Sequence, residues 1–440
     1  MNAVLIAVVI MVGLSLARVH VVLSLIIGAV AGGLVAGLTV ADTLTAFQDG
    51  LKNGAQIALS YAILGAFAMA IAHSGAPKLL ADAMTVRLNQ ASATRSVKWL
   101  LFAVVCVMAI FSQNLIPIHI AFIPLIIPPL LLLFNRLQVD RRLLACLMTF
   151  GLVNTYMFIP YGFGDIFLNQ IILKNINDAG MDTTGASIMQ IMIIPALGML
   201  IGLLLAVFVS YRKPRVYQNI EVAKAADALM TSDKPSHYRA WVALVAIIAA
   251  FLVHLYTDSL LMGSIAGFAI FMASGVVKWR EADSVFNDGI KMMAMIGFIM
   301  ISAQGFAEVM KATGQIDALV VGAMEVFGGN QAVAAFVMLI IGLVVTLGIG
   351  SSFSTVPILA AIYVPLCMAL GFSMPATIAL VATAGVLGDA GSPASDSTLG
   401  PTMGLNMDGQ HDHIKDSVLP TFIHYNIPLI IFGWIAAMVL

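Results

Sequence analysis

Charged side chains are scarce in this sequence. Asp, Glu, Lys and Arg make up 10% of its 440 residues, against 61% hydrophobic residues, whereas soluble globular domains carry roughly 25% charged residues. The formal net charge is −1, so there is no basic excess of the kind that favours nucleic-acid binding. These shortages exclude a soluble globular protein and argue against a nucleic-acid-binding one.

Cysteine is also rare. Cys106, Cys146 and Cys367 lie in apolar segments without CxxC or histidine-spaced partners, so we expect small buried hydrophobic residues rather than metal ligands or disulfides. The first apolar segment, 3–17, has no basic stretch before it. Signal peptides carry such a stretch, and we therefore expect this segment to be retained as a helix.

Apolar runs, by contrast, are abundant. Many are long enough to cross the roughly 30 Å hydrocarbon core of a bilayer as helices. They lie at 21–38, 54–73, 188–210, 241–256, 259–277, 333–350 and 418–440. We therefore predict an all-α polytopic membrane protein that is embedded in a lipid bilayer and has no nucleic-acid partner.

The chain also repeats itself. Residues 47–52 read Phe-Gln-Asp-Gly-Leu-Lys, and residues 286–291 read Phe-Asn-Asp-Gly-Ile-Lys. Further matches follow at similar spacing: Ser24 with Ser259, Gly28 with Gly263, Ser112 with Ser352, Gly151 with Gly385, Pro160 with Pro393, and Pro195 with Pro428. Duplicated membrane units are typical of secondary transporters.

Each half divides into five crossings and one helical hairpin. The first half is 1–210, the second is 240–440, and the polar segment 211–239 links them. Because five is an odd number, the second half enters the membrane in the opposite orientation, so we predict inverted repeats. The hairpins lie near 99–134 and 333–370. We expect the Asp-Gly pairs of the two echoing motifs to start helices.

The few basic residues set the orientation. With the N-terminus outside, all of the 21 Lys and Arg residues except Lys52, Lys174 and Lys311 fall on the inner side. Basic loops favour the cytoplasm. We therefore predict a protein of a bacterial-type inner (plasma) membrane, with both termini outside and the linker 211–239 in the cytoplasm.

Polar residues interrupt the apolar hairpins at their tips. Hydroxyl and amide oxygens stand there beside a proline, Pro117 or Pro357, and together with freed carbonyls they suit a hard cation such as Na⁺. The alternative is hydrogen bonding between packed helices. The candidate ion or substrate ligands of the two tips are Ser112, Gln113, Asn114, Ser352, Ser354 and Thr355.

One crossing in each half is broken by Pro, Gly and polar residues, within 141–175 and 375–407. Carboxyl groups at this depth mark ion or proton pathways. Burial favours the protonated form and a bound Na⁺ the ionised form, so the two ions compete. Helix capping is the alternative role, above all for Asp396. The candidates are Asn154, Thr155, Asp165, Asp389, Ser392 and Asp396, with Na⁺ expected near Asn114, Thr355 and Asp389.

Three further polar residues could contact substrate or carry protons. His119 follows the first hairpin tip, and His424 and Asn426 lie beside Pro428 in the last crossing. A histidine in such a position can exchange a proton near neutral pH. The alternative is a buried histidine with satisfied hydrogen bonds.

The second break also carries a family motif. It reads Gly388-Asp389-x-x-Ser392-Pro393-x-Ser395-Asp396-Ser397-Thr398 and resembles the G-D-x-x-S-P-x-S-D-T-T signature of NhaC-type Na⁺/H⁺ antiporters, with Ser397 replacing the usual Thr. Length and repeat layout resemble the YuiF-like branch, described as amino-acid permeases. The resemblance implies two hairpins and two broken helices meeting at the bilayer midplane, in a homodimer; Asp165 lies outside the matching motif.

Our first reading is a secondary transporter that imports a small amino acid, of the histidine type, with Na⁺ rather than H⁺ as the coupling ion and no cofactor. No Lys or Arg needs to lie in the proposed core, and its three carboxylates suit a zwitterion, a cation or bare ions better than a dianion. The second hypothesis is Na⁺/H⁺ exchange without an organic substrate. A passive channel is a further alternative, although broken helices in both halves fit alternating access around a fixed site better.

An intramembrane aspartyl protease is a remote alternative. Gly162-Phe163-Gly164-Asp165 resembles the GxGD element of those enzymes, and Pro195-Ala196-Leu197 resembles their PAL element. Their chemistry also needs a Tyr-Asp pair, and the sequence contains no such dipeptide.

Overall fold

The computed structural model describes residues 2–17, 19–76, 79, 95–114, 119–218, 236–257, 259–349, 352–393 and 395–440. Within these ranges the regular secondary structure is helical, as predicted. Five described helices are long and apolar enough to cross a membrane: Ser96–Asn114, Ile188–Ser210, His237–Thr257, Ser352–Leu370 and His413–Val439. Several shorter apolar helices accompany them. The all-α membrane fold is therefore confirmed.

The described helices of the first half include one 34-residue element, α3. They are α1 (Ala3–Leu16), α2 (Val21–Val35), α3 (Val40–His73), α5 (Arg95–Asn114), α6 (His119–Arg136), α7 (Arg141–Tyr156), α8 (Phe163–Asp165), η1 (Ile166–Leu173), α9 (Lys174–Asp178), α10 (Ile188–Leu205) and η2 (Ala206–Ser210). The η elements are stretches of π-helix.

The second half repeats this order. Its helices are α12 (His237–Thr257), α13 (Leu260–Ala273), α14 (Ala282–Ala312), α15 (Ile316–Phe327), α16 (Gln331–Ile349), α17 (Ser352–Leu370), α18 (Met374–Val386), α19 (Asp396–Leu405), η3 (His413–Val418), α20 (Leu419–Thr421), η4 (Phe422–Asn426) and α21 (Ile427–Val439). The five crossings and one hairpin predicted for the second half did not include the helix α15.

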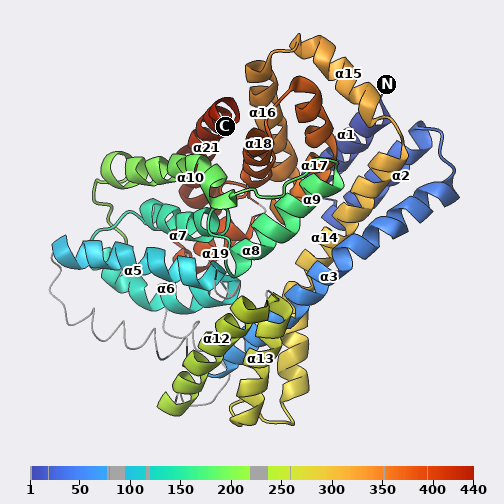
Figure 1. The fold of residues 1–440 in the computed structure, drawn as a ribbon. Coiled ribbons are helices and arrows are strands. Elements are labelled where there is room, and N and C mark those ends of the chain that lie inside the picture. The colour runs from blue at the N-terminus through green and yellow to red at the C-terminus, as the bar shows by residue number, and fades with distance from the viewer. Residues whose placement is uncertain are drawn as a thin grey trace.

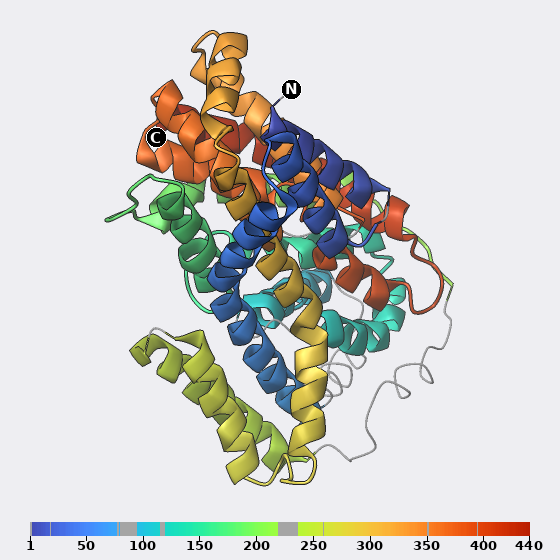
Figure 2. The same ribbon diagram turned by 90° about the vertical axis from the view of Figure 1, so that its right-hand side faces the viewer.

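The long helices α3 and α14 are counterparts in the repeat and pack side by side (Figures 1 and 2). A Cβ atom at Gly50 would meet the backbone of Gln304, and one at Gly65 would meet the backbone of Gly289. Along these contacts the residue numbers rise in α3 and fall in α14, so the two helices run antiparallel. Inverted repeats require this relation of two counterpart helices; inversion of the remaining helices stays a prediction.

The Asp-Gly pairs do not start helices, contrary to the prediction. Gly50 and Gly289 lie inside α3 and α14, at the places where the two backbones touch. The neighbouring charges form exposed pairs, Lys52 with Asp49 at 2.7 Å and Lys291 with Asp288 at 3.3 Å. With a rise of 1.5 Å per residue α3 is roughly 51 Å long, well beyond the hydrocarbon thickness. Its first turns therefore have room to lie outside the apolar layer.

Both expected helix breaks are present. The first lies at 157–162, between α7 and α8, and the second at 387–395, between α18 and α19, where residue 394 is not described. Gly162 has φ 61° and Gly388 has φ 90°, backbone conformations that glycine adopts far more readily than other residues. The hairpins α5–α6 and α16–α17 are present as well, although residues 115–118, 350 and 351 at their tips lie outside the described part.

A buried ion pair joins the two broken helices at the ends that lie farthest from their breaks. Arg141 begins α7, and its guanidinium donates to the carboxylate of Asp408, at 2.6 Å from Nη1 to Oδ1, and to the carbonyl of Leu405 at the end of α19. Both charged side chains are almost inaccessible to solvent. The start of one broken helix is thereby fixed to the end of the other.

Candidate functional site

The second break places a carboxylate among hydroxyl groups. Asp389 is 7% exposed, and its Oδ2 accepts hydrogen bonds from the hydroxyl of Ser352, at 2.8 Å, and from the hydroxyl of Tyr156. The other oxygen, Oδ1, accepts from Ser395. The Tyr156 and Ser352 oxygens also lie 2.7 Å apart. We call Asp389, Tyr156, Ser352 and Ser395 the Asp389 cluster.

The cluster joins three parts of the fold that are distant in sequence. Tyr156 is the last residue of α7, directly before the first break, and Ser352 begins α17 at the tip of the second hairpin. Ser395 lies in the second break with Asp389 and caps α19 by accepting from the backbone N–H of Ser397. The carboxylate is thus held from both breaks and one hairpin.

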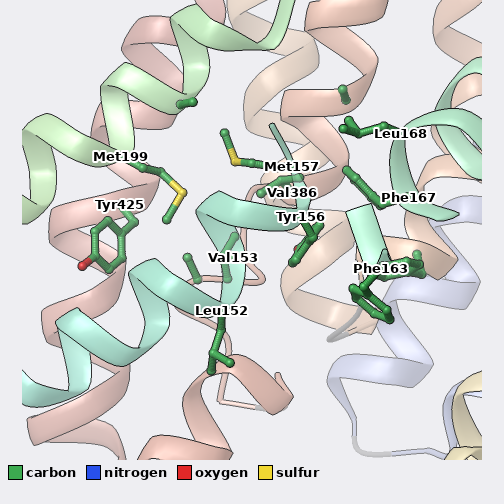
Figure 3. Close-up of a cluster of buried hydrophobic side chains, with 14 of the residues drawn as sticks. Leu152, Val153, Tyr156, Met157, Phe163, Phe167, Leu168, Met199, Val386 and Tyr425 are labelled. Atoms are coloured by element: carbon green, nitrogen blue, oxygen red, sulfur yellow. The ribbon is translucent and has the colours of Figure 1, made fainter. Parts of the chain in front are cut away.

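Aromatic rings fix the position of the Tyr156 side chain, which is fully buried. Its ring centre lies 5.9 Å from that of Phe163, 4.9 Å from Phe167 and 5.5 Å from Phe353. Figure 3 shows Tyr156 in this surrounding, with Phe163 nearby. Tilted and edge-on ring pairs at such distances are favourable, so the hydroxyl is presented to Asp389 with little freedom to turn away.

Sequence analysis missed Tyr156 and Ser395 as site residues, although the repeat contained a signal for Tyr156. Tyr156 and Asp389 are separated by 233 positions, the same separation as the matched prolines Pro160 and Pro393 (393 − 160 = 233). To within one position the two residues are therefore counterparts in the two copies, and they contact one another. One copy supplies the acid and the other its hydrogen-bond donor.

The first hairpin tip contacts the first break instead. The amide of Asn114 donates to the carbonyl of Tyr161 at 3.1 Å and accepts from the backbone N–H of Gly164 at 3.2 Å. Ser112 and Thr155 donate to carbonyls of their own helices, Ala109 and Gly151. Asn114 therefore satisfies freed backbone groups of the break.

Asp165 lies in a different environment from Asp389. It follows the first break, is 8% exposed, and accepts from the side-chain amides of Asn169 at 2.6 Å and Gln170 at 2.9 Å. Asn169 and Gln170 belong to the π-helical stretch η1. The described hydrogen-bond partners of Asp165 are thus side-chain amides rather than a second carboxyl group.

Four predicted site residues have a buried polar atom without a partner in the described structure: Gln113 Oε1, Asn154 Oδ1, Ser354 Oγ and Asn426 Nδ2. The same Asn426 side chain accepts from the backbone N–H of Gly388 at 2.9 Å through Oδ1, which directs it to the second break. Buried polar groups nearly always have a partner, so such atoms around hairpin tips and helix breaks point to a ligand.

The remaining candidates are spread more widely. Thr355 is fully buried on α17 and lies one turn from Ser352. Ser392 Oγ is 3.4 Å from the carbonyl of Leu347, and Asp396 begins α19, partly exposed. His424 binds the Pro420 carbonyl at 2.7 Å and Ser210 at 2.8 Å.

The described hydrogen bonds of two expected Na⁺ ligands, Asn114 and Asp389, go to different partners. Asn114 contacts the first break, whereas Asp389 contacts Ser352, Ser395 and Tyr156. The side chain of His119 lies outside the described residues. Among the described contacts of Asp389 there is no Lys or Arg, so the cluster offers oxygen ligands and a single negative charge.

Comparison with known proteins decides the class of protein. The model of the Na⁺/H⁺ antiporter family matches residues 147–434, and a second model, Na⁺-H⁺ antiporter family, matches residues 2–88. The chain belongs to the Na⁺/H⁺ antiporter family. The resemblance read from the second break is thereby confirmed.

Full-length relatives within this family support the assignment. A Bacillus subtilis protein described as "Putative amino acid transporter YuiF" is 49% identical over 450 residues, covering 100% of both chains. An uncharacterized membrane protein of Vibrio parahaemolyticus is 56% identical over 444 residues, again covering 100% of both. The chain is therefore a multi-pass membrane transporter and not an enzyme, which sets the protease alternative aside.

Two solved structures share the fold. The YdaH transporter of Alcanivorax borkumensis has a TM-score of 0.59 at 15% identity, covering 90% of this chain and 88% of that one. MtrF of Neisseria gonorrhoeae, described with a class of antimetabolite efflux pumps, has a TM-score of 0.61 at 17% identity, covering 90% and 84%. At this identity the likeness shows the fold alone.

Proposed function

We propose that this antiporter-family member imports a small amino acid by alternating access, with Na⁺ as the coupling ion and the Asp389 cluster as the ion site. The observation that carries the proposal is the arrangement of one buried carboxylate among three hydroxyls at a helix break. Oxygen ligands at broken helices are a typical Na⁺ environment in secondary transporters.

The charge of the cluster favours a monovalent cation. The Asp389 carboxylate carries one negative charge, and a single Na⁺ or H⁺ neutralises it. Each hydroxyl that now donates to the carboxylate can rotate its hydrogen away and turn a lone pair toward an ion. Na⁺ and a proton therefore compete for the same carboxylate, which is a physical route to coupling.

The unpartnered atoms around the breaks support a zwitterionic substrate. Gln113 Oε1 and Asn154 Oδ1 are acceptors that suit an ammonium group, and Asn426 Nδ2 is a donor that suits a carboxylate. The positive end of the α19 dipole at the second break also favours a carboxylate. No basic side chain is needed, in line with a substrate of zero net charge.

The second candidate is Na⁺/H⁺ exchange without an organic substrate. The family name favours it, and the Asp389 cluster serves it equally well. The name of the B. subtilis relative favours amino-acid transport, and the polar atoms that lie beyond the cluster have no function in simple exchange.

Transport by purified protein in proteoliposomes separates the two candidates. We expect a Na⁺ gradient to drive uptake of a labelled amino acid from a panel that includes histidine. Exchange of Na⁺ for H⁺, measured with a pH-sensitive dye in the same vesicles but without amino acid, should be slow. Clear exchange with no amino-acid uptake would replace the first candidate by the second.

The oligomeric state, the membrane and the orientation of the chain are proposed on the same basis. We infer a homodimer in a bacterial inner membrane, with both termini outside and residues 211–239 in the cytoplasm. Both chain ends lie toward the same end of the molecule in Figures 1 and 2, which supports a common side for them. Labelling of single cysteines placed at residues 2 and 213 by a membrane-impermeant reagent tests the sides.

A further inference from the structure

The start of α5 and the end of η2 lie together at one boundary of the apolar layer. The candidate spans Ser96–Asn114 and Ile188–Ser210 begin and end there, on the left side of the molecule in Figure 1. The rings of Trp99 and Phe208 join the two helix ends, with ring centres 5.6 Å apart, and both side chains are exposed. Exposed aromatic rings at the end of a span are typical of the level of the lipid headgroups.

Three basic residues flank this ring pair. Lys98 directly precedes Trp99, and the exposed residues Arg212 and Lys213 follow η2. The stretches 95–114 and 188–215 contain no Asp or Glu. In the described part of the chain, the ion pairs include none of these three basic residues. The positive charge at this helix end is therefore not compensated by a neighbouring carboxylate.

Other basic side chains of the protein are neutralised locally. Arg142 lies 2.6 Å from Asp140, and Lys291 lies 3.3 Å from Asp288. The group formed by Lys98, Arg212 and Lys213 differs from these pairs, and its charge complements an anion. Basic residues that directly follow a membrane span attract the anionic headgroups of lipids.

Apolar side chains continue from this corner along both helices. Leu100, Val107 and Phe111 are exposed on α5, and Leu204 and Leu205 are exposed at the end of α10. A soluble anion would use only the basic residues of the corner. An anion that carries acyl chains would also cover these apolar faces, so the surface fits a lipid better than free phosphate.

We propose that Lys98, Arg212 and Lys213, together with Trp99 and Phe208, form a binding site for one anionic phospholipid. The basic side chains hold the phosphate of the headgroup, and their apolar stems lie along the membrane surface. The rings lie at the level of the headgroup, and the acyl chains extend along α5 and α10. This site is separate from the Asp389 cluster and does not depend on the proposed function.

The test uses the fluorescence of Trp99 in protein whose other tryptophans are replaced, as Trp241→Phe, Trp279→Phe and Trp434→Phe. The protein is placed in phosphatidylcholine vesicles that contain a small share of phosphatidylglycerol with brominated acyl chains, which quench a neighbouring indole. The comparison is the same share of brominated phosphatidylcholine. We expect phosphatidylglycerol to quench more strongly, because each basic residue near the membrane surface strengthens binding of anionic lipid roughly fivefold.

Removal of the three charges in this background should abolish the preference. For Lys98→Gln with Arg212→Gln and Lys213→Gln, we expect the affinity for phosphatidylglycerol relative to phosphatidylcholine to fall roughly tenfold or more. If this triple variant does not fold, Arg212→Gln with Lys213→Gln replaces it and should lose most of the preference. Inorganic phosphate at constant ionic strength should not reduce the quenching by phosphatidylglycerol.

The matched control removes the same number of positive charges from residues that have a carboxylate within 4 Å. It is Lys52→Gln with Lys291→Gln and Lys311→Gln, and it should keep the preference. Equal quenching by the two lipids in the parent would overturn the site, as would a preference that survives the loss of the three charges. An equal loss in the control would show diffuse attraction by net charge, and displacement by inorganic phosphate would show a site for a soluble anion. None of these measurements involves transport, so the outcome is independent of the proposed function.

Discussion

At the scale of single residues, Tyr156 is the residue of the first copy that contacts Asp389 of the second copy. Its hydroxyl donates to Asp389, and a hydrogen bond to a charged group contributes about 1.5–3 kcal/mol. The bond favours the ionised carboxylate, which is the form that would bind Na⁺ under the proposed function. Without it, a proton competes more strongly for the same oxygen.

Tyr156→Phe keeps the ring among Phe163, Phe167 and Phe353 and removes only the hydroxyl. We expect the half-saturating Na⁺ concentration for transport to rise roughly tenfold or more, and to rise further at lower pH. Tyr425→Phe is the matched control, because that buried tyrosine donates to the Cys146 carbonyl at 2.6 Å, outside the cluster. An unchanged Na⁺ dependence in Tyr156→Phe would contradict the assigned role.

His411 gives a residue-scale prediction about stability. It is 2% exposed, in the turn before the last span, and its Nε2 is 2.7 Å from the Ser417 hydroxyl. Burial lowers the pKa of His411 to about 4. Between pH 6.5 and 4 the unfolded chain binds a proton at this histidine and the folded chain does not. The free energy of unfolding therefore decreases as the pH is lowered through this range, by about 3 kcal/mol in total.

His411→Gln should reduce this loss. The unfolding temperature of the variant in detergent, measured from pH 7 to pH 4, is expected to fall less steeply than that of the parent. The control is His237→Gln, since His237 is exposed at the start of α12 and should not change the slope. Equal slopes for parent and His411→Gln would show that His411 is not the group that resists protonation.

At the scale of elements, α3 and α14 depend on glycines at their crossing. Gly65→Ala places a Cβ against the backbone of Gly289, and overpacking of this kind destabilises by about 1–3 kcal/mol. We expect a lower unfolding temperature for this variant. Gly322→Ala is the control, since a Cβ there meets nothing within 4 Å and alanine favours the helix α15. A Gly65→Ala variant as stable as the parent would contradict the close antiparallel contact.

Most elements could be predicted from the sequence, because apolar runs and helix breakers act locally. The hairpins, both breaks and the order of helices follow from such runs and from the repeat. The π-helical stretches η1 to η4 were not predicted, since hydrophobic periodicity does not distinguish them from α-helix. The Asp-Gly pairs were misread because their glycines serve a helix crossing, which only the partner helix reveals.

The candidate site was predictable in part. Asp389 and Ser352 stood out as polar groups within apolar segments, and the structure joins them. Tyr156 did not stand out, because a tyrosine in an apolar helix is ordinarily a packing residue. Its contact with Asp389 spans 233 positions and depends on how the two copies face each other, which the spacing alone suggests but does not determine.

At the scale of the whole molecule, the two copies are alike in architecture and different in chemistry. Counterpart helices α3 and α14 pack against one another, and counterpart residues Tyr156 and Asp389 share a hydrogen bond. The acidic group of the cluster comes from the second copy. Under the proposed function, ion binding at this junction would therefore involve both broken helices at once.

Equilibrium binding of radioactive Na⁺ to the purified protein tests this account most directly. For the parent we predict saturable binding that falls as pH is lowered, since a proton competes for Asp389. Asp389→Asn, which keeps the shape of the side chain but not its charge, should bind no Na⁺, whereas Asp165→Asn should still bind it. Na⁺ binding by Asp389→Asn equal to that of the parent would contradict the central claim.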